Sequence, residues 1–192
     1  MHSLPRVAQA APIRQSIGFY AGGSLPVAPV EFKTLWDAGY GFSGVVRFRL
    51  TPRIHGDLEV GYYRHLSDNA AFKSLISQQH PNVTLSGYDL WVVPISLVGE
   101  FDLLKRSSTK PYLIVGGGYY KFGVTKAAIS GPGSESVQLP DPPDSAFGVQ
   151  GGLGVRTPIS LGITLSVDIN VHVSFTADEF TQFMPVRLGL QF

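Results

Sequence analysis

The chain has 192 residues, a formal net charge of +1 and no cysteine. The absence of cysteine excludes a disulfide framework, a thiolate metal site and thiol catalysis. The small net charge argues against a strongly basic surface that binds nucleic acid. Charged residues make up only 15% of the chain, well below the ~25% of typical soluble domains. The length suits one domain with a sizeable core, and no apolar run reaches the ~18 residues that indicate a membrane-spanning helix.

Residues 1–14 are predicted to form a tail outside the folded domain. Ala8, Gln9 and Ala10 have the small-x-small form of a signal-peptidase site, although no apolar segment of roughly 7–15 residues precedes them. Two interpretations stay open, a signal-peptide remnant and an ordinary tail. The folded domain is therefore expected over residues 15–192.

Apolar and polar residues alternate repeatedly along residues 15–192, which is the period-2 pattern of strands with two unlike faces. The strictest example is LGITLSVDINVHVSF, which is apolar at every odd position and small or polar at every even position. Long helical patterns are missing. Eight strands are predicted, over Gln15–Ser24, Ala38–Leu50, Ile54–His65, Tyr88–Asp102, Tyr112–Val124, Ser145–Arg156, Leu161–Phe175 and Thr181–Phe192.

The connections between these strands alternate in length. Those after the second, fourth and sixth strands are short, and the others are generally longer. One long connection predicts a short helix, because Asp68 can cap a run that places Phe72, Leu75, Ile76 and Gln79 on one side. Short turns at one end and long loops at the other are typical of an up-and-down barrel in an outer membrane.

The alternation alone fits two opposite barrels. A soluble lipocalin-like barrel turns its apolar face inward, whereas a transmembrane barrel turns that face to lipid. A water-facing sheet carries few glycines because glycine weakens strands, yet the polar face of the second strand holds Gly39, Gly41 and Ser43 beside two arginines. Such small residues suit a narrow interior where they make room for a few long side chains. The sequence therefore predicts an all-β, eight-stranded antiparallel transmembrane barrel.

Strand length and aromatic placement agree with this prediction. Every predicted strand reaches the ~9–11 residues of a membrane strand, and a closed barrel satisfies all backbone hydrogen-bonding groups in lipid. Aromatic residues near strand ends are expected to form an interfacial girdle. They include Trp91, Tyr112, Tyr120 and Phe122.

The predicted inward faces carry five charges of each sign. They are Arg47, Arg49, Lys121, Arg156 and Arg187 against Asp57, Glu59, Glu100, Asp102 and Asp168. A charge in a low-dielectric interior is costly unless it is paired, and eight strands enclose a lumen just wide enough for side chains to fill. This balance predicts a salt-bridged plug, with a narrow ion path as the alternative.

The last predicted strand, FMPVRLGLQF, places Val186, Leu188, Leu190 and Phe192 on one face. It resembles the C-terminal signal that is read by the outer-membrane barrel assembly machinery. The whole chain resembles small eight-stranded outer-membrane barrels of the OmpA/OmpX type. That resemblance implies a monomeric, integral protein of the bacterial outer membrane that is exported through the periplasm. Its implied partners are outer-membrane lipids, lipopolysaccharide, the assembly machinery and an extracellular ligand or surface met by the long loops.

His172 and Ser174 resemble the His-x-Ser pair of lipid A deacylases that are eight-stranded barrels. Phe175 stands where that family has Asn, and the predicted register turns the pair inward, away from the lipid. We therefore expect a non-enzymatic protein with a structural or surface-interaction role, and no catalytic residues, cofactor or metal site. A narrow pore, a lipid A deacylase and a soluble ligand-binding barrel are the alternatives.

Overall fold

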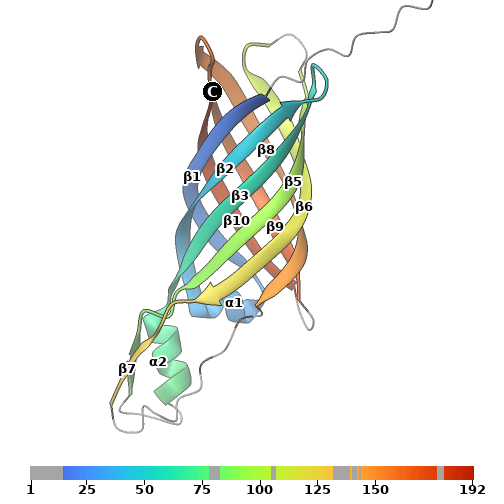
Figure 1. Ribbon diagram of the computed structural model, residues 1–192. Helices are drawn as coiled ribbons and strands as arrows, with labels where there is room; N and C mark the ends of the chain where they lie inside the picture. Colours follow the sequence, from blue (N-terminus) through green and yellow to red (C-terminus); the bar gives the residue numbers. More distant parts are fainter. Residues whose placement is uncertain are drawn as a thin grey trace, which may run out of the picture.

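The computed structural model describes residues 15–77, 83–104, 107–131, 139, 142, 144–176 and 180–192. The predicted tail, residues 1–14, lies outside this range. Eight antiparallel strands close into a barrel in the order β1-β10-β9-β8-β6-β5-β3-β2 (Figure 1), as the alternation predicts. The strands are β1 (Gln15–Ala28), β2 (Trp36–Arg49), β3 (Ile54–Ser67), β5 (Leu90–Asp102), β6 (Lys110–Val124), β8 (Ser145–Ser160), β9 (Ile163–Phe175) and β10 (Phe180–Gln191).

The predicted strand boundaries are displaced most at the β1–β2 connection, where β1 continues to Ala28 instead of Ser24, and at the β8–β9 hairpin. Leu161, which was expected to begin a strand, lies instead in a turn with Gly162. Gly162 adopts a φ of 83°, a left-handed conformation that glycine tolerates without steric cost. The tight turn lets β8 continue to Ser160, beyond the predicted end at Arg156.

The two faces of the sheet differ as the sequence pattern predicts. Along β9, Val167 and Ile169 are exposed on the outside, whereas Asp168, Asn170 and His172 are buried inside. An apolar outer face around a polar interior is the arrangement of a transmembrane barrel and the inverse of a soluble one.

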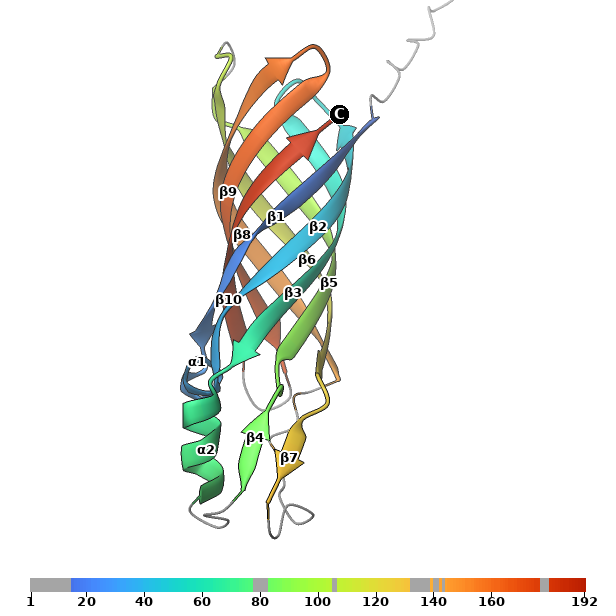
Figure 2. The same cartoon turned by 90° about the vertical axis from the view of Figure 1, so that its left-hand side faces the viewer.

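A small folded extension projects from the long-loop end of the barrel (Figures 1 and 2). It contains α1 (Val30–Leu35), α2 (Asn69–Ser77), and the two-stranded sheet of β4 (Thr84–Ser86) and β7 (Ala128–Ser130). Only α2 was predicted. Asp68 caps it, because its Oδ1 accepts the N–H groups of Ala70 and Ala71 at 2.9 and 3.0 Å.

The buried side of α2 is narrower than its sequence indicates. Phe72 and Ile76 are buried, but Leu75 is 48% exposed, which corrects the predicted face. Gln79, its fourth predicted member, lies outside the described residues. None of the helices in the described part of the chain is long and apolar enough to cross a bilayer.

Aromatic side chains close the loop end of the barrel beneath this extension. The ring centroid of Trp36 lies 5.9 Å from that of Phe32 and 5.5 Å from that of Phe72, and Phe72 lies 5.5 Å from Tyr88. The indole N–H of Trp36 donates to the carbonyl oxygen of Tyr88 at 3.1 Å. The lumen is thus covered at this end by a packed apolar layer.

Close strand packing at one inward glycine gives a test of the barrel geometry. A Cβ on Gly118 would lie 2.1 Å from the carbonyl oxygen of Ile95, so Gly118→Val is expected to abolish most refolding into detergent micelles. The yield is measured as the heat-modifiable fraction on gels. The matched control is Gly151→Val, because a Cβ there would meet only one atom, at 3.8 Å. Equal refolding of the two variants would contradict the packing.

Candidate functional site

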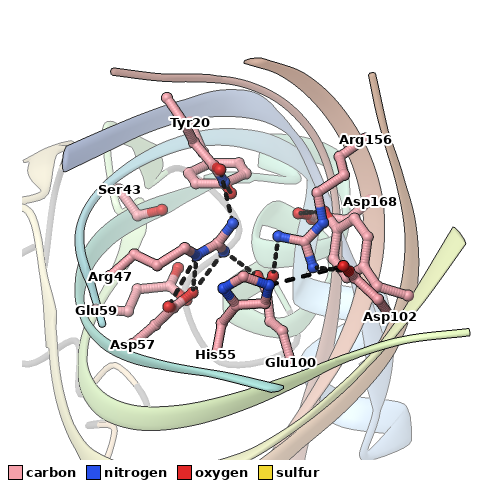
Figure 3. Close-up of polar contacts among 12 residues, drawn as sticks. Tyr20, Ser43, Arg47, His55, Asp57, Glu59, Glu100, Asp102, Arg156 and Asp168 are labelled. Carbon is pink, nitrogen blue, oxygen red and sulfur yellow. Dashed lines mark hydrogen bonds and ion pairs between the residues drawn. The ribbon is translucent and has the colours of Figure 1, made fainter. Parts of the chain in front are cut away.

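The lumen holds a connected set of ion pairs, and Arg47 on β2 lies at one end of it (Figure 3). Its Nη2 is 2.6 Å from Oδ2 of Asp57 and 2.5 Å from Oε1 of Glu100. Its Nη1 donates to Oε1 of Gln191 at 2.6 Å. Arg47 and Asp57 are direct cross-strand partners in the β2–β3 register, so the hairpin itself positions this pair.

Arg156 on β8 extends the network across the lumen. Its Nη1 lies 2.8 Å from Oε2 of Glu100, and its Nη2 lies 2.8 Å from Oδ1 of Asp102. The guanidinium also lies 4.1 Å from the ring centroid of Tyr112, which is a cation–π distance. Glu100 therefore joins Arg47 to Arg156, as Figure 3 shows.

The carboxylate of Asp102 lies toward the short-turn end of the barrel, where it has two further basic residues beside it. Its Oδ2 is 3.4 Å from Nζ of Lys110 and 3.7 Å from Nε2 of His55.

A second group of charges is centred on Arg187 of β10. Its Nε lies 2.8 Å from Oδ1 of Asp168, its direct partner in the β9–β10 register. Its Nη1 donates to Glu59 and, at 3.2 Å, to the hydroxyl oxygen of Tyr63. The hydroxyl of Tyr112 donates to Asp168 at 3.2 Å, so this tyrosine lies between the two groups.

Each buried carboxylate of the network contacts an arginine. The pairs of Arg47 with Asp57 and of Arg187 with Asp168 join neighbouring strands. Glu100 and Asp102 on β5 and Glu59 on β3 pair with arginines on strands that are not their neighbours. In a low-dielectric interior such charges persist only when they are paired and hydrogen-bonded. The arrangement links side chains of six strands, β2, β3, β5, β8, β9 and β10, inside the barrel.

Eight of the ten predicted lumen charges are buried and lie in this network. They are Arg47, Asp57, Glu59, Glu100, Asp102, Arg156, Asp168 and Arg187. Arg49 and Lys121 are exposed and lie elsewhere. Arg49 follows the alternation of the inward-facing residues of β2, but it is the last residue of the strand and lies beyond the ion-pair network. Lys121 belongs to the outward phase of β6, together with Leu113, Val115 and Tyr119.

The inward face of β6 also corrects the predicted aromatic girdle. Tyr112, Tyr120 and Phe122 are buried in the interior rather than placed at the membrane interface. Both faces of β6 carry apolar residues, so its sequence does not show which set points inward. Tyr20 and Gln191 were missed as well, although both occupy the inward phase of their strands.

Comparison with known proteins identifies the family of this barrel. The sequence profile described as the outer membrane protein beta-barrel domain matches residues 4–192. The chain belongs to this family. It is accordingly an integral β-barrel protein of the bacterial outer membrane. None of the curated proteins compared with the sequence matches it significantly.

Solved structures share the fold at low sequence identity. Neisserial surface protein A is 11% identical with a TM-score of 0.58, over 92% of this chain and 95% of that one. OprG from Pseudomonas aeruginosa is 10% identical with a TM-score of 0.54, over 94% and 97% of the two chains. A major outer membrane protein from Thermus thermophilus is 15% identical with a TM-score of 0.51, over 93% and 98%.

The two residues of the deacylase-like motif lie inside this outer-membrane barrel. Nδ1 of His172 is 3.0 Å from the hydroxyl of Tyr120, and the imidazole stacks on Phe183 with ring centroids 4.6 Å apart. The hydroxyl of Ser174 donates to the carbonyl oxygen of Thr181 at 3.2 Å. Both side chains thus face inward with other partners. Among the described residues no cluster of three or more His, Asp or Glu side chains is arranged to hold a metal ion.

The four residues of the predicted assembly signal form an outward apolar strip on β10. Val186, Leu188, Leu190 and Phe192 are 41%, 55%, 39% and 57% exposed. The strand is held by β1 through a reciprocal pair of backbone bonds. The N–H of Phe192 donates to the carbonyl oxygen of Ile17 at 2.9 Å, and the N–H of Ile17 donates to the carbonyl oxygen of Phe192 at 3.2 Å.

Asp89 anchors the extension to the barrel. Its Oδ2 accepts Nε and Nη2 of Arg64 at 2.9 and 2.7 Å, and its Oδ1 accepts the backbone N–H of Ser67 at 2.9 Å. Its own N–H donates to Oγ1 of Thr125 at 2.9 Å. Burial opposes the charged form, but the bonds from Ser67 and Arg64 outweigh it and lower the pKa of the Asp89 carboxyl below its usual value.

Arg187→Leu should strongly destabilise the barrel, because it leaves Glu59 and Asp168 buried without their cation. Breaking a buried pair in this way costs about 3–5 kcal/mol. Urea unfolding in micelles measures the loss. The control is Arg49→Leu at the exposed strand end, for which a change within about 0.5 kcal/mol is expected. A similar loss in both variants would argue against the network as the source of stability.

Acid should loosen the extension through Asp89. Because the folded pKa lies below the unfolded value of about 3.9, the stabilisation is present above that value and is lost as pH falls through the folded pKa. Fluorescence of Trp36 in a Trp91→Phe background should report this transition below about pH 4. Asp89→Asn should remove the transition, whereas Asp144→Asn, at an exposed position, should retain it. An unchanged acid transition in Asp89→Asn would contradict the assignment.

Proposed function

We propose that this protein is a non-enzymatic outer-membrane barrel with a closed lumen, which serves as a structural support for a folded extracellular extension that meets a surface or ligand outside the cell. The observation that carries the proposal is the ion-pair network, in which arginines on β2, β8 and β10 pair with acids on strands that are not their neighbours. The aromatic layer around Trp36 and Phe72 supports closure at the other end.

The construction of the extension supports a role at the cell surface. Long loops of outer-membrane barrels face outward, and loops on a rigid scaffold commonly carry binding functions. Here the bonds of Asp89 and the indole of Trp36 fix the base of the extension to the barrel wall. Val30 on α1 and Leu75 on α2 expose 75% and 48% of their surface, which supplies apolar contact area beyond the membrane.

The outward strip of β10 supports assembly by the barrel assembly machinery. Val186, Leu188, Leu190 and Phe192 present the alternate apolar side chains that such a signal requires, on the strand that pairs with β1 to close the barrel. We assign them this role in biogenesis rather than in the activity of the folded protein.

Two alternative activities have less support. An ion path would have to cross a region where each arginine bridges carboxylates on other strands. A deacylase would have to present His172 and Ser174 to lipid, but both are fully buried with partners inside the lumen.

Planar-bilayer recording tests the closed lumen. The reconstituted wild-type barrel is expected to give no single-channel steps, because ion pairs from several strands meet within the lumen. Steps in the wild type that change in size in Glu100→Gln and Arg187→Gln would overturn the proposal in favour of a pore. Fatty-acid release from lipopolysaccharide that Ser174→Ala abolishes would overturn its non-enzymatic part.

A further inference from the structure

Basic side chains gather at the short-turn end of the lumen, which is called the periplasmic mouth below because short turns of outer-membrane barrels face the periplasm. This end is uppermost in Figure 1. Arg49 and Arg53 are exposed there, and Lys110 is half-buried. The described residues of the three short turns include no aspartate or glutamate. The exposed charge at the mouth is therefore positive.

Four basic side chains surround Asp102 of β5. Nη2 of Arg156 lies 2.8 Å from its Oδ1, and Nζ of Lys110 and Nε2 of His55 lie 3.4 and 3.7 Å from its Oδ2. Arg53 reaches the same point through the main chain. Its Nε donates to the carbonyl oxygen of Asp102 at 3.1 Å, and its Nη2 donates to the next carbonyl oxygen at 3.2 Å. These two bonds hold the Arg53 guanidinium beside the other bases.

Two arginines of the mouth have no carboxylate partner. Arg53 bonds to carbonyl oxygens, and Arg49 is the direct cross-strand partner of His55 in the β2–β3 register. Neither forms an ion pair with any residue that the structure describes. Among the described residues of this half of the barrel, five cations thus face three carboxylates. They are Arg47, Arg49, Arg53, Lys110 and Arg156 against Asp57, Glu100 and Asp102.

Hydrogen-bond donors are in excess at the mouth as well. The Arg156 side chain is only 8% exposed, and its buried Nε has no acceptor among the described residues. Figure 3 shows this side chain together with His55 and Asp102. A buried N–H without an acceptor is unfavourable, and so is unbalanced charge beside a low-dielectric interior. An anion that enters from the periplasm supplies both the acceptor oxygens and the negative charge.

A phosphate group matches these side chains. Guanidinium groups present planar pairs of donors that fit phosphate oxygens, and a lysine ammonium binds phosphate as a point charge. The side chains of Lys110 and His55 are 32% and 14% exposed, so small solutes reach them from the periplasm. A phosphate group also offers several charged oxygens at once, which two unpaired arginines require.

We propose that the periplasmic mouth binds the phosphate group of a soluble periplasmic anion through Arg49, Arg53 and Lys110, with Arg156 behind them. A phospholipid headgroup carries the same chemistry, and competition between the two separates these sources. The site lies at the end of the barrel opposite the extension, so it is independent of the function proposed for the extension.

Isothermal titration calorimetry of the full barrel in an uncharged maltoside detergent tests the site, with inorganic pyrophosphate as the probe at constant ionic strength. Wild type is expected to bind one molecule. Arg49→Gln should weaken binding by about five-fold, because one cation at a membrane surface contributes about 1 kcal/mol. Lys73→Gln on α2 is the matched control, since it removes the same charge from an exposed position at the other end of the molecule, and it should bind as wild type does.

The double variant Arg49→Gln/Arg53→Gln should weaken pyrophosphate binding by about 25-fold, as two such cations are lost. Heat-modifiable migration confirms that each variant is folded. Short-chain phosphatidylglycerol is the competitor, and pyrophosphate should bind in its absence and displace it. Binding of the lipid with none of pyrophosphate would overturn the soluble source. Equal affinities in wild type, Arg49→Gln and Lys73→Gln would overturn the site itself.

Discussion

The width of an eight-stranded barrel is the constraint on which this structure depends. Its lumen is just wide enough for side chains to fill, so every inward charge must find its partner within the same narrow space. Arg187 satisfies this requirement with Asp168 beside it and Glu59 across the lumen. Where a large side chain lies flat, the neighbouring strand supplies glycine: a Cβ on Gly154 would lie 2.3 Å from the Tyr112 ring, and one on Gly189 would lie 2.3 Å from the Tyr20 ring.

This filling divides the barrel into two unlike halves. The short-turn half is cross-linked by charges, and the loop half is packed with rings, from the stacked pair of His172 and Phe183 to Trp36 and Phe72.

The sequence predicts the barrel well because the alternation of apolar and polar residues depends on the environment of each face. It is less informative where that contrast fails. On β6 both faces are apolar, so Lys121 and Tyr120 were assigned to the wrong sides. Arg49 follows the inward phase yet stands at the strand end, and periodicity carries no information about where the filled lumen ends.

The alternation of residues along a strand also does not predict which inward charges pair with each other. Arg47 with Asp57 follows from the register of one tight hairpin. Glu100, by contrast, joins arginines from β2 and β8, which are brought together only when the whole barrel closes. The small elements α1, β4 and β7 were not predicted for a related reason, since each is only 3 to 6 residues long and has no internal period to detect.

The glycine-rich start of β2 shapes both the inner and the outer face of the barrel wall. Within it, Gly41 and Ser43 point inward, where Gly41 leaves room for the ring of Tyr63 and Ser43 accepts a bond from Arg187 at 3.2 Å. Gly44 points outward and lines an apolar groove on the outer wall. The glycine content that first distinguished a narrow lumen from a water-facing sheet therefore has two effects. It makes room for large side chains inside the barrel, and at Gly44 it leaves an open position on the outer face of the same wall.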